Sequence, residues 1–154
     1  MVITFCMLKR YLLFLTLVLL GVACDKNKLE TKPSLKIKNI NTTDVLPGGQ
    51  LVITLEYKDK EGDLGGGIIT YVRTRLNQKP IPDAASNDKA DTVERILPNF
   101  PKTTTGDIEL KIDNAYMSED PFENDTMTFK IVVKDVANNV SDTVETGQVV
   151  DKQN

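Results

Sequence analysis

Histidine is absent from the chain, and cysteine occurs only twice, as Cys6 and Cys24. Without an imidazole there is no histidine general base and no zinc site of the usual Cys/His kind. Beyond Cys24 no cysteine remains, so the rest of the chain has neither a disulfide nor a cysteine nucleophile. A domain in that part must depend on its hydrophobic core, and the chain is long enough to build one.

An excess of positive charge is also lacking. The sequence has 19 Lys and Arg residues against 22 Asp and Glu residues, a formal net charge of −3. Such a surface repels nucleic acid and anionic lipid. Nucleic acid is therefore not expected among the partners.

Charge is scarce at the N-terminus, where Lys9 and Arg10 are the only charged residues among the first 23. They precede an apolar run from Tyr11 to Leu20, which is the order of an export signal. The stretch from Tyr11 to Ala23 is shorter than the about 20 residues that a membrane-spanning helix needs. Residues 1–23 are therefore predicted to be a removable leader.

The end of this leader, Gly21-Val22-Ala23-Cys24, resembles the lipobox of bacterial lipoproteins. The resemblance implies cleavage before Cys24 and attachment of lipid, palmitate included, to its thiol. Gly21 departs from the family pattern, which has Leu, Val or Ile there, and an ordinary signal peptide followed by an incidental cysteine is the alternative. Residues 24–33 are polar and without periodicity, and they are interpreted as a lipidated tether.

From residue 34 onward, apolar residues recur at every second position, which is typical of strands with one buried face. Strands are predicted over residues 34–40, 51–57, 68–76, 92–96, 108–112, 127–133 and 140–150, the last broken near Gly147. Turn residues separate them, as in Pro-Gly-Gly at 47–49 and Gly65-Gly66-Gly67. About seven antiparallel strands in one domain, residues 34–154, favour an all-β, immunoglobulin-like (Ig-like) sandwich over a closed barrel.

Two stretches add a resemblance to that pattern: residues 57–65, YKDKEGDLG, and residues 133–142, VKDVANNVSD. Both stretches resemble those of small, uncharacterised Ig-like β-sandwich lipoproteins of Gram-negative bacteria. The second is similar to the V-x-D-x-A-G-N-x-S hairpin of bacterial Ig-like domains, with Asn138 where glycine is usual. Asparagine tolerates the left-handed backbone that this position implies.

The first of these stretches is an acidic, glycine-rich loop in which Asp59, Glu61 and Asp63 alternate with other residues. In an Ig-like sandwich it shares one end of the domain with the second stretch, which brings Asp135 and Asn138 toward it. Such oxygen donors suit calcium, although the spacing is not that of an EF-hand. A solvated acidic turn is the alternative explanation.

The same strand order places the tether at the end of the domain with these acidic loops. The opposite end carries a long segment, residues 114–124, in which Tyr116, Met117 and Phe122 interrupt an acidic run. Exposed aromatic residues on loops are typical anchors for recognition, so these three are candidate binding residues. The alternative is that Tyr116 or Phe122 plugs the end of the core.

An enzyme of this composition must work with carboxylates. Candidates for an acid/base pair are Asp113, Glu119, Asp120, Glu123 and Asp125, as in a glycosidase-like cleft. No candidate nucleophile or base has an identifiable partner in the sequence. A non-catalytic protein is therefore expected, with a small accessory hydrolase as the alternative.

Three tripeptides resemble the Asp-Thr-aliphatic motif for O-glycosylation of exported proteins in some Gram-negative bacteria. Their threonines are Thr92, Thr126 and Thr143. Threonine beside an aliphatic residue is also ordinary strand composition. Together the patterns predict a lipid-anchored binding or structural module of the cell envelope, on the periplasmic or cell-surface side, with an envelope protein or a glycan as its ligand.

Overall fold

The computed structural model describes residues 31–81 and 90–153. They belong to one compact unit, Thr31–Asn154. The predicted leader, Cys24 and the first part of the predicted tether lie outside these residues. Within the described ranges, no helix is both long and apolar enough to cross a membrane.

The described residues form nine strands and one short helix. These are β1 Ser34–Ile40, β2 Asp44–Val45, β3 Gln50–Lys58, β4 Ile68–Arg75, β5 Ala90–Ile96, β6 Thr105–Asp113, α2 Asn114–Met117, β7 Asp125–Lys134, β8 Val144–Glu145 and β9 Val149–Asp151. The predicted all-β class is confirmed. The predicted break near Gly147 is also found, between β8 and β9.

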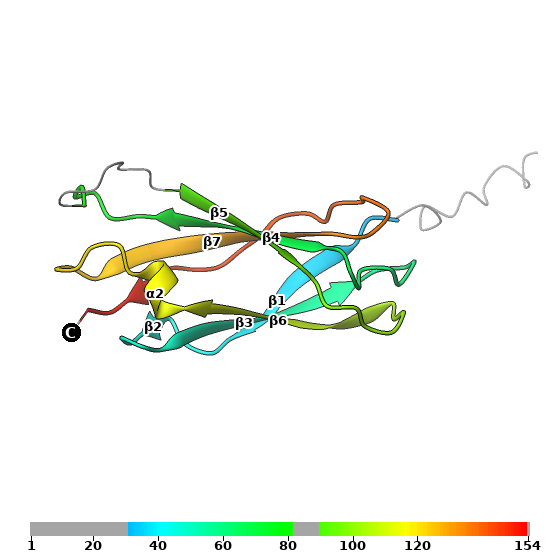
Figure 1. Cartoon of the computed structure of the whole chain (residues 1–154), viewed down its shortest axis with the longest axis horizontal. Helices are drawn as coiled ribbons and strands as arrows, with labels where there is room; N and C mark the ends of the chain where they lie inside the picture. Colours follow the sequence, from blue (N-terminus) through cyan, green and yellow to red (C-terminus); the bar gives the residue numbers. More distant parts are fainter. Residues whose placement is uncertain (1–30, 82–89, 154) are drawn as a thin grey trace, which may run out of the picture. The chain divides into compact units, whose positions relative to one another are not determined.

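The strands form two sheets that face each other (Figure 1). One sheet has the order β1-β3-β6, and the other has the order β2-β9-β7-β4-β5, with β8 also paired to β7. The sequence predicted only antiparallel pairs, but β2 runs parallel to β9, where Asp44 pairs with Val150. A strand of two residues has no periodicity from which to predict it.

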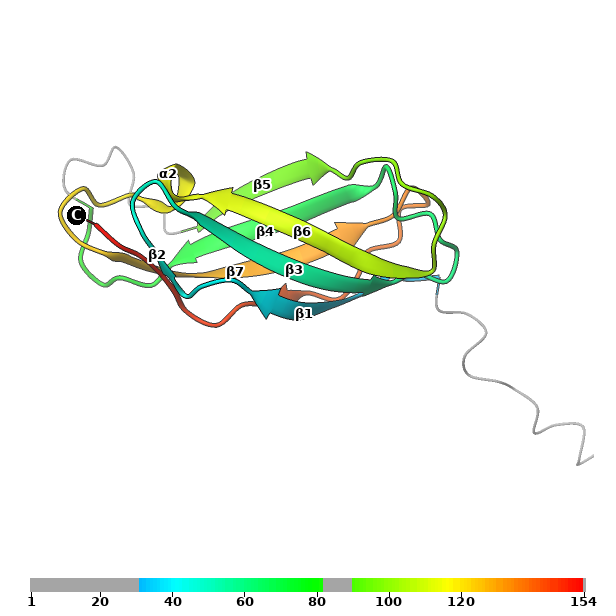
Figure 2. The same cartoon turned by 90° about the horizontal axis from the view of Figure 1, so that it is seen from below.

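The core lies between the sheets because the two central strands each turn one face inward. In β3, which Figure 2 shows between β1 and β6, buried residues alternate with more exposed ones, and β7 has the same alternation. The inward side chains are Leu51, Ile53, Leu55, Tyr57, Met127, Phe129, Ile131 and Val133. This alternation is the one that the sequence predicted, and it fixes which residues each end of the domain presents.

Candidate functional site

The N-terminal segment joins the domain at the end where the predicted acidic loops lie. Ser34, the first residue of β1, pairs with Lys58, the last residue of β3, and Lys58 pairs with Thr105 on its other side. Lys32 forms an ion pair with Asp142, which follows β7. Among the described residues, the chain thus enters the domain at the end that carries the acidic loops, as the sequence predicted. We call this end the tether end, and the opposite end, which carries α2, the distal end.

Three of the five predicted calcium-binding residues meet at the tether end. Carboxylate oxygens of Asp59, Asp63 and Asp135 all lie within 4.8 Å of one another. They come from the loop after β3 and the loop after β7. Glu61 is exposed and outside this group, and Asn138 is exposed at φ 70°, the left-handed conformation that the sequence predicted.

The two loops meet because Gly67 has no side chain. A Cβ at this position would lie 2.2 Å from the carbonyl oxygen of Lys134 and 3.2 Å from Cα of Asp135. Any larger residue would push the loop after β3 away from the end of β7. The loops are also joined by a hydrogen bond from the Val136 N–H to the Asp63 carbonyl, at 3.4 Å.

Asp59 and Asp135 are buried and hold the backbone of their own loops. Asp59 accepts hydrogen bonds from the N–H groups of Glu61, at 3.2 Å, and Asp63, at 2.9 Å. Asp135 accepts from the N–H and the side-chain amide of Asn139, at 2.8 and 2.9 Å. The alternative of a solvated acidic turn is therefore wrong for these two residues, because desolvated carboxylates shape both loops.

Asp63 differs from its two neighbours. Its Oδ1 is buried without a hydrogen-bond partner. Burial raises the pKa of the Asp63 carboxyl above its ordinary value, and the negative charges of Asp135 and Asp59 raise it further. Calcium takes six to eight oxygen ligands, and carboxylates that already accept one hydrogen bond keep lone pairs for a cation. The three residues can contribute part of such a set.

At the distal end, one buried ion pair organises the segment before β7. Arg75 of β4 and Asp125 of β7 are both buried, and Arg75 Nε donates to Asp125 Oδ1 at 2.5 Å. The other oxygen of Asp125 accepts hydrogen bonds from the N–H groups of Glu119, at 2.8 Å, and Asp120, at 2.7 Å. The carboxylate of Asp125 thus ties β4 to the segment that follows α2.

The same segment carries Phe122 outward. Asp120 is buried, lies 3.8 Å from Arg75 Nη2 and accepts a hydrogen bond from the Phe122 N–H at 2.9 Å. The Phe122 side chain is nevertheless 77% exposed. We call residues 118–124 the clamped loop, since buried carboxylates fix its backbone while its one aromatic ring faces solvent.

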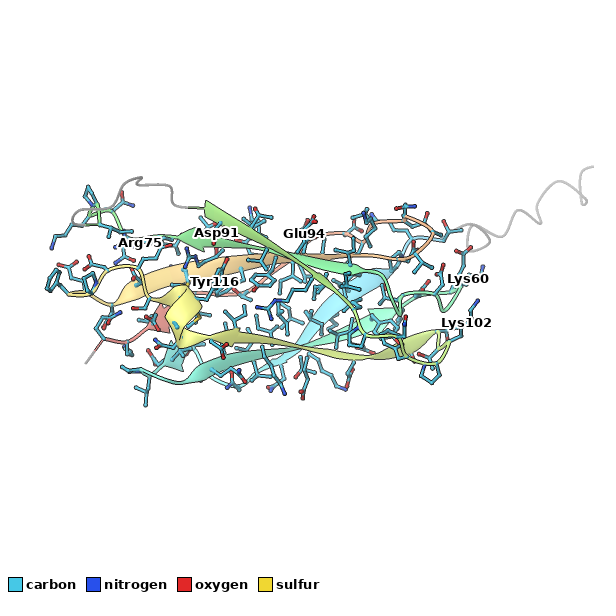
Figure 3. The ribbon with its side chains drawn as sticks, in the orientation of Figure 1. Lys60, Arg75, Asp91, Glu94, Lys102 and Tyr116 are labelled. Atoms are coloured by element: carbon cyan, nitrogen blue, oxygen red, sulfur yellow. The ribbon has the colours of Figure 1, made fainter. Side chains whose placement is uncertain are left out.

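The other two candidate binding residues face the core. Met117 is fully buried, so the expectation that it offers a surface to a partner is wrong. Tyr116 (Figure 3) packs edge-on against Tyr71, at 5.9 Å between ring centres. The Arg73 guanidinium lies 4.7 Å from the centre of the Tyr116 ring. Burial raises the pKa of the Tyr116 hydroxyl. Tyr116 therefore serves as the plug that the sequence analysis offered as the alternative.

The carboxylates of the hydrolase alternative are each engaged in a structural contact. Asp113 accepts a hydrogen bond from the Gln50 side chain at 2.7 Å. Glu119 pairs with Arg73, and Glu123 pairs with Lys79. Asp120 and Asp125 belong to the cluster around Arg75. A surface hollow of about 240 Å³ between β1 and β3 is lined by none of these acids but by Ser34, Leu35, Lys36, Glu56 and Lys58.

The three candidate glycosylation sites differ in exposure. Thr92 lies on β5 and Thr143 directly before β8, and both are exposed. Thr126 is partly buried in β7, where its N–H donates to the Asn77 side chain at 2.8 Å. A glycan is thus accommodated more easily on Thr92 and Thr143 than on Thr126.

Arg73 and Arg75, which pair with Glu119, Asp120 and Asp125 at the distal end, were not predicted from the sequence. A signal was present, because Ile69, Tyr71, Arg73 and Arg75 occupy successive inward positions of β4. Comparison with known proteins adds no relative: no family model and no curated protein matches the chain.

Proposed function

We propose that the chain is an exported lipoprotein, anchored by lipid on Cys24, whose Ig-like sandwich is a non-catalytic binding module of the cell envelope. The anchor rests on the order of basic, apolar and small residues before Cys24. The Ig-like assignment is supported by the strand order. Strands β1, β3 and β6 take the places of A, B and E, while β4, β7 and β9 take those of C, F and G.

The observation that carries the binding role is the clamped loop with its exposed Phe122. Buried polar groups such as Asp120 and Asp125 cost free energy unless their partners are in place, and here they fix a loop rather than a reaction centre. A rigid loop loses little entropy on binding, and an exposed aromatic ring supplies contact area that recognition sites use. The position of the loop, opposite the tether end, leaves it accessible to a partner.

A hydrolase finds less support in this geometry. A general acid or base must reach the proton it transfers, and a catalytic pair must flank the substrate. The candidate acids instead bond to arginines, a lysine, a glutamine and the loop backbone. We therefore assign Asp120 and Asp125 to the support of the loop.

The test compares Phe122→Ala with two control variants. Partners are recovered from the source envelope with the lipidated protein as bait, and each variant is also melted. Phe122→Ala is expected to lose partners without losing stability, because its ring is exposed. Leu46→Ala removes another exposed side chain, 66% exposed, at the same end and should lose neither.

The second control is Tyr116→Ala, which should lose stability because Tyr116 packs on the core. Unchanged partners with Phe122→Ala would refute recognition through the clamped loop. An equal loss of partners with Leu46→Ala would show that the contact is not specific to Phe122.

A further inference from the structure

The tether end carries exposed aliphatic side chains on the outer face of the larger sheet and in the loop after β7. Ile96 is 79% exposed, Val136 56% and Val140 45%. Two of them belong to one cross-strand row, since Ile96 pairs with Ile68, Ile68 with Lys134, and Lys134 with Val140. Directly paired side chains in a sheet lie about 5 Å apart on the same face. We call Ile96, Ile68 and Val140, together with the exposed Val136 of the loop after β7, the apolar row.

The apolar row is not needed by the core. The residues that adjoin Ile96, Ile68 and Lys134 in the sequence point inward and are buried. They are Leu97, Ile69 and Val133. In the next row of the same outer face, Thr70 pairs with Glu94 on one side and with the partly exposed Val132 on the other. The exposed aliphatic residues of this face, Ile96 and Val140, thus lie in the last row before the loops of the tether end.

The place of the apolar row matters because of the chain that precedes the domain. If lipid is attached to Cys24, residues 25–30 separate it from Thr31, the first described residue. Even fully extended, that segment spans only about 25 Å. The lipid therefore keeps the tether end close to a bilayer surface.

The tether end carries charges of both signs, which suits a zwitterionic headgroup layer rather than an anionic one. Lys60 and Lys102 lie at this end (Figure 3), and Lys134 lies between Ile68 and Val140 in the cross-strand pairing. Exposed Glu61 and the carboxylates of Asp59, Asp63 and Asp135 offset their charge, and Asp142 pairs with Lys32. Lysine stems can lie along apolar surface while their ammonium groups reach phosphate.

We propose that the apolar row rests on the bilayer that holds the lipid and orients the distal end away from it. This inference rests on the proposed lipid anchor. Three exposed aliphatic side chains give weak binding from solution, but a short tether raises their effective concentration at the surface. Contact through the row would fix the orientation of the domain, with Phe122 turned toward partners.

The absence of tryptophan from the sequence permits a direct test. Val136→Trp introduces a single reporter at the row, and Phe122→Trp introduces one at the distal end. The lipidated full chains are reconstituted into phosphatidylcholine vesicles, with or without bromine-labelled acyl chains. Because bromine quenches tryptophan only at short range, emission should fall for Val136→Trp and stay unchanged for Phe122→Trp. Ile96→Trp provides a second reporter at the row.

Failure of this inference differs from failure of the anchor. If the chains float with the vesicles but neither Val136→Trp nor Ile96→Trp is quenched, the row does not touch the bilayer and the inference is overturned. Equal quenching of Phe122→Trp would also overturn it. A blue shift at Val136→Trp that depends on protein concentration, without quenching, would assign the row to a second copy. Chains that carry no lipid and do not float would overturn the anchor and the inference together.

Discussion

Replacing Arg75 by methionine tests whether the distal end depends on its buried ion pair. Methionine keeps much of the length of the side chain but removes the charge that faces Asp125 and Asp120. Both carboxylates are fully buried, so they would lose their cation without gaining water. Breaking a buried pair in this way costs about 3 to 5 kcal/mol.

The expected effect on the melting temperature follows from the size of the folded unit, Thr31–Asn154. An unfolding entropy of about 2 cal/mol/K per residue gives about 0.25 kcal/mol per kelvin. Arg75→Met should therefore lower the melting temperature by about 12 to 20 K, measured by calorimetry together with urea unfolding.

Lys79→Met is the matched control, because Lys79 pairs with Glu123 at the same end but largely in solvent. Exposed pairs contribute about 0 to 1 kcal/mol, so this variant should melt within about 4 K of the wild type. A loss below about 1 kcal/mol for Arg75→Met, or equal losses for the two variants, would refute the reasoning. The loop would then not depend on the buried pair.

Three further predictions concern the core and the acidic cluster. Ile131→Ala should cost about 2 to 5 kcal/mol in urea unfolding, because Ile131 is fully buried between the sheets, and a loss under about 1 kcal/mol would count against the core. Asp63→Asn should raise the melting temperature near pH 7 in the presence of a chelator. Because the pKa of Asp63 is raised in the folded state, ionisation of this carboxyl destabilises the folded protein once the pH exceeds the ordinary pKa of aspartate. The gain in melting temperature should therefore vanish in acid, where the carboxyl is protonated in both states. Millimolar calcium should raise the melting temperature of the wild type but not of Asp63→Asn, and a flat wild-type response would leave the three carboxylates a purely structural role.

Asp63 is a sharper position for the calcium test than Asp59. Asp59 accepts two backbone hydrogen bonds, so Asp59→Asn disturbs the turn as well as the charge. Oδ1 of Asp63 accepts none. Substitution there changes the electrostatics of the cluster with less effect on the loop.

The strands were predictable because one face of each is buried. Alternation in β3 and β7 is strong enough to give both their extent and their inward residues, such as Leu55 and Ile131. The parallel pairing of β2 with β9 was not predictable, since two residues carry no period and the pairing joins positions far apart in the sequence.

The acidic cluster was predicted in part. The strand order brings Asp135 to Asp59 and Asp63, as the sequence analysis expected. Their burial was not foreseen, because it depends on the close approach of the loops at Gly67. Hydrogen bonds within each loop, such as those of Asp135 with Asn139, depend on side-chain geometry that no spacing reveals.

At the distal end, the sequence of residues 114–124 is compatible both with recognition of a partner and with packing on the core. An acidic run broken by apolar residues predicts a loop, but only the fold tells which apolar residue turns inward. Met117 enters the core, Tyr116 covers it and Phe122 remains outside. The arginines that pair with Glu119, Asp120 and Asp125 come from β4. There Arg73 and Arg75 occupy inward positions that are apolar earlier in the strand.

Mass spectrometry of the mature N-terminus tests the central claim most directly. The protein is isolated from the membranes of an expressing Gram-negative cell, and its N-terminal peptide is sequenced. A lipid-anchored module predicts a chain that begins at Cys24 and carries a diacylglyceryl group on the thiol, and Cys24→Ser should leave the membrane fraction. A mature chain with an unmodified Cys24, or a wild type as soluble as Cys24→Ser, would contradict the proposed anchor.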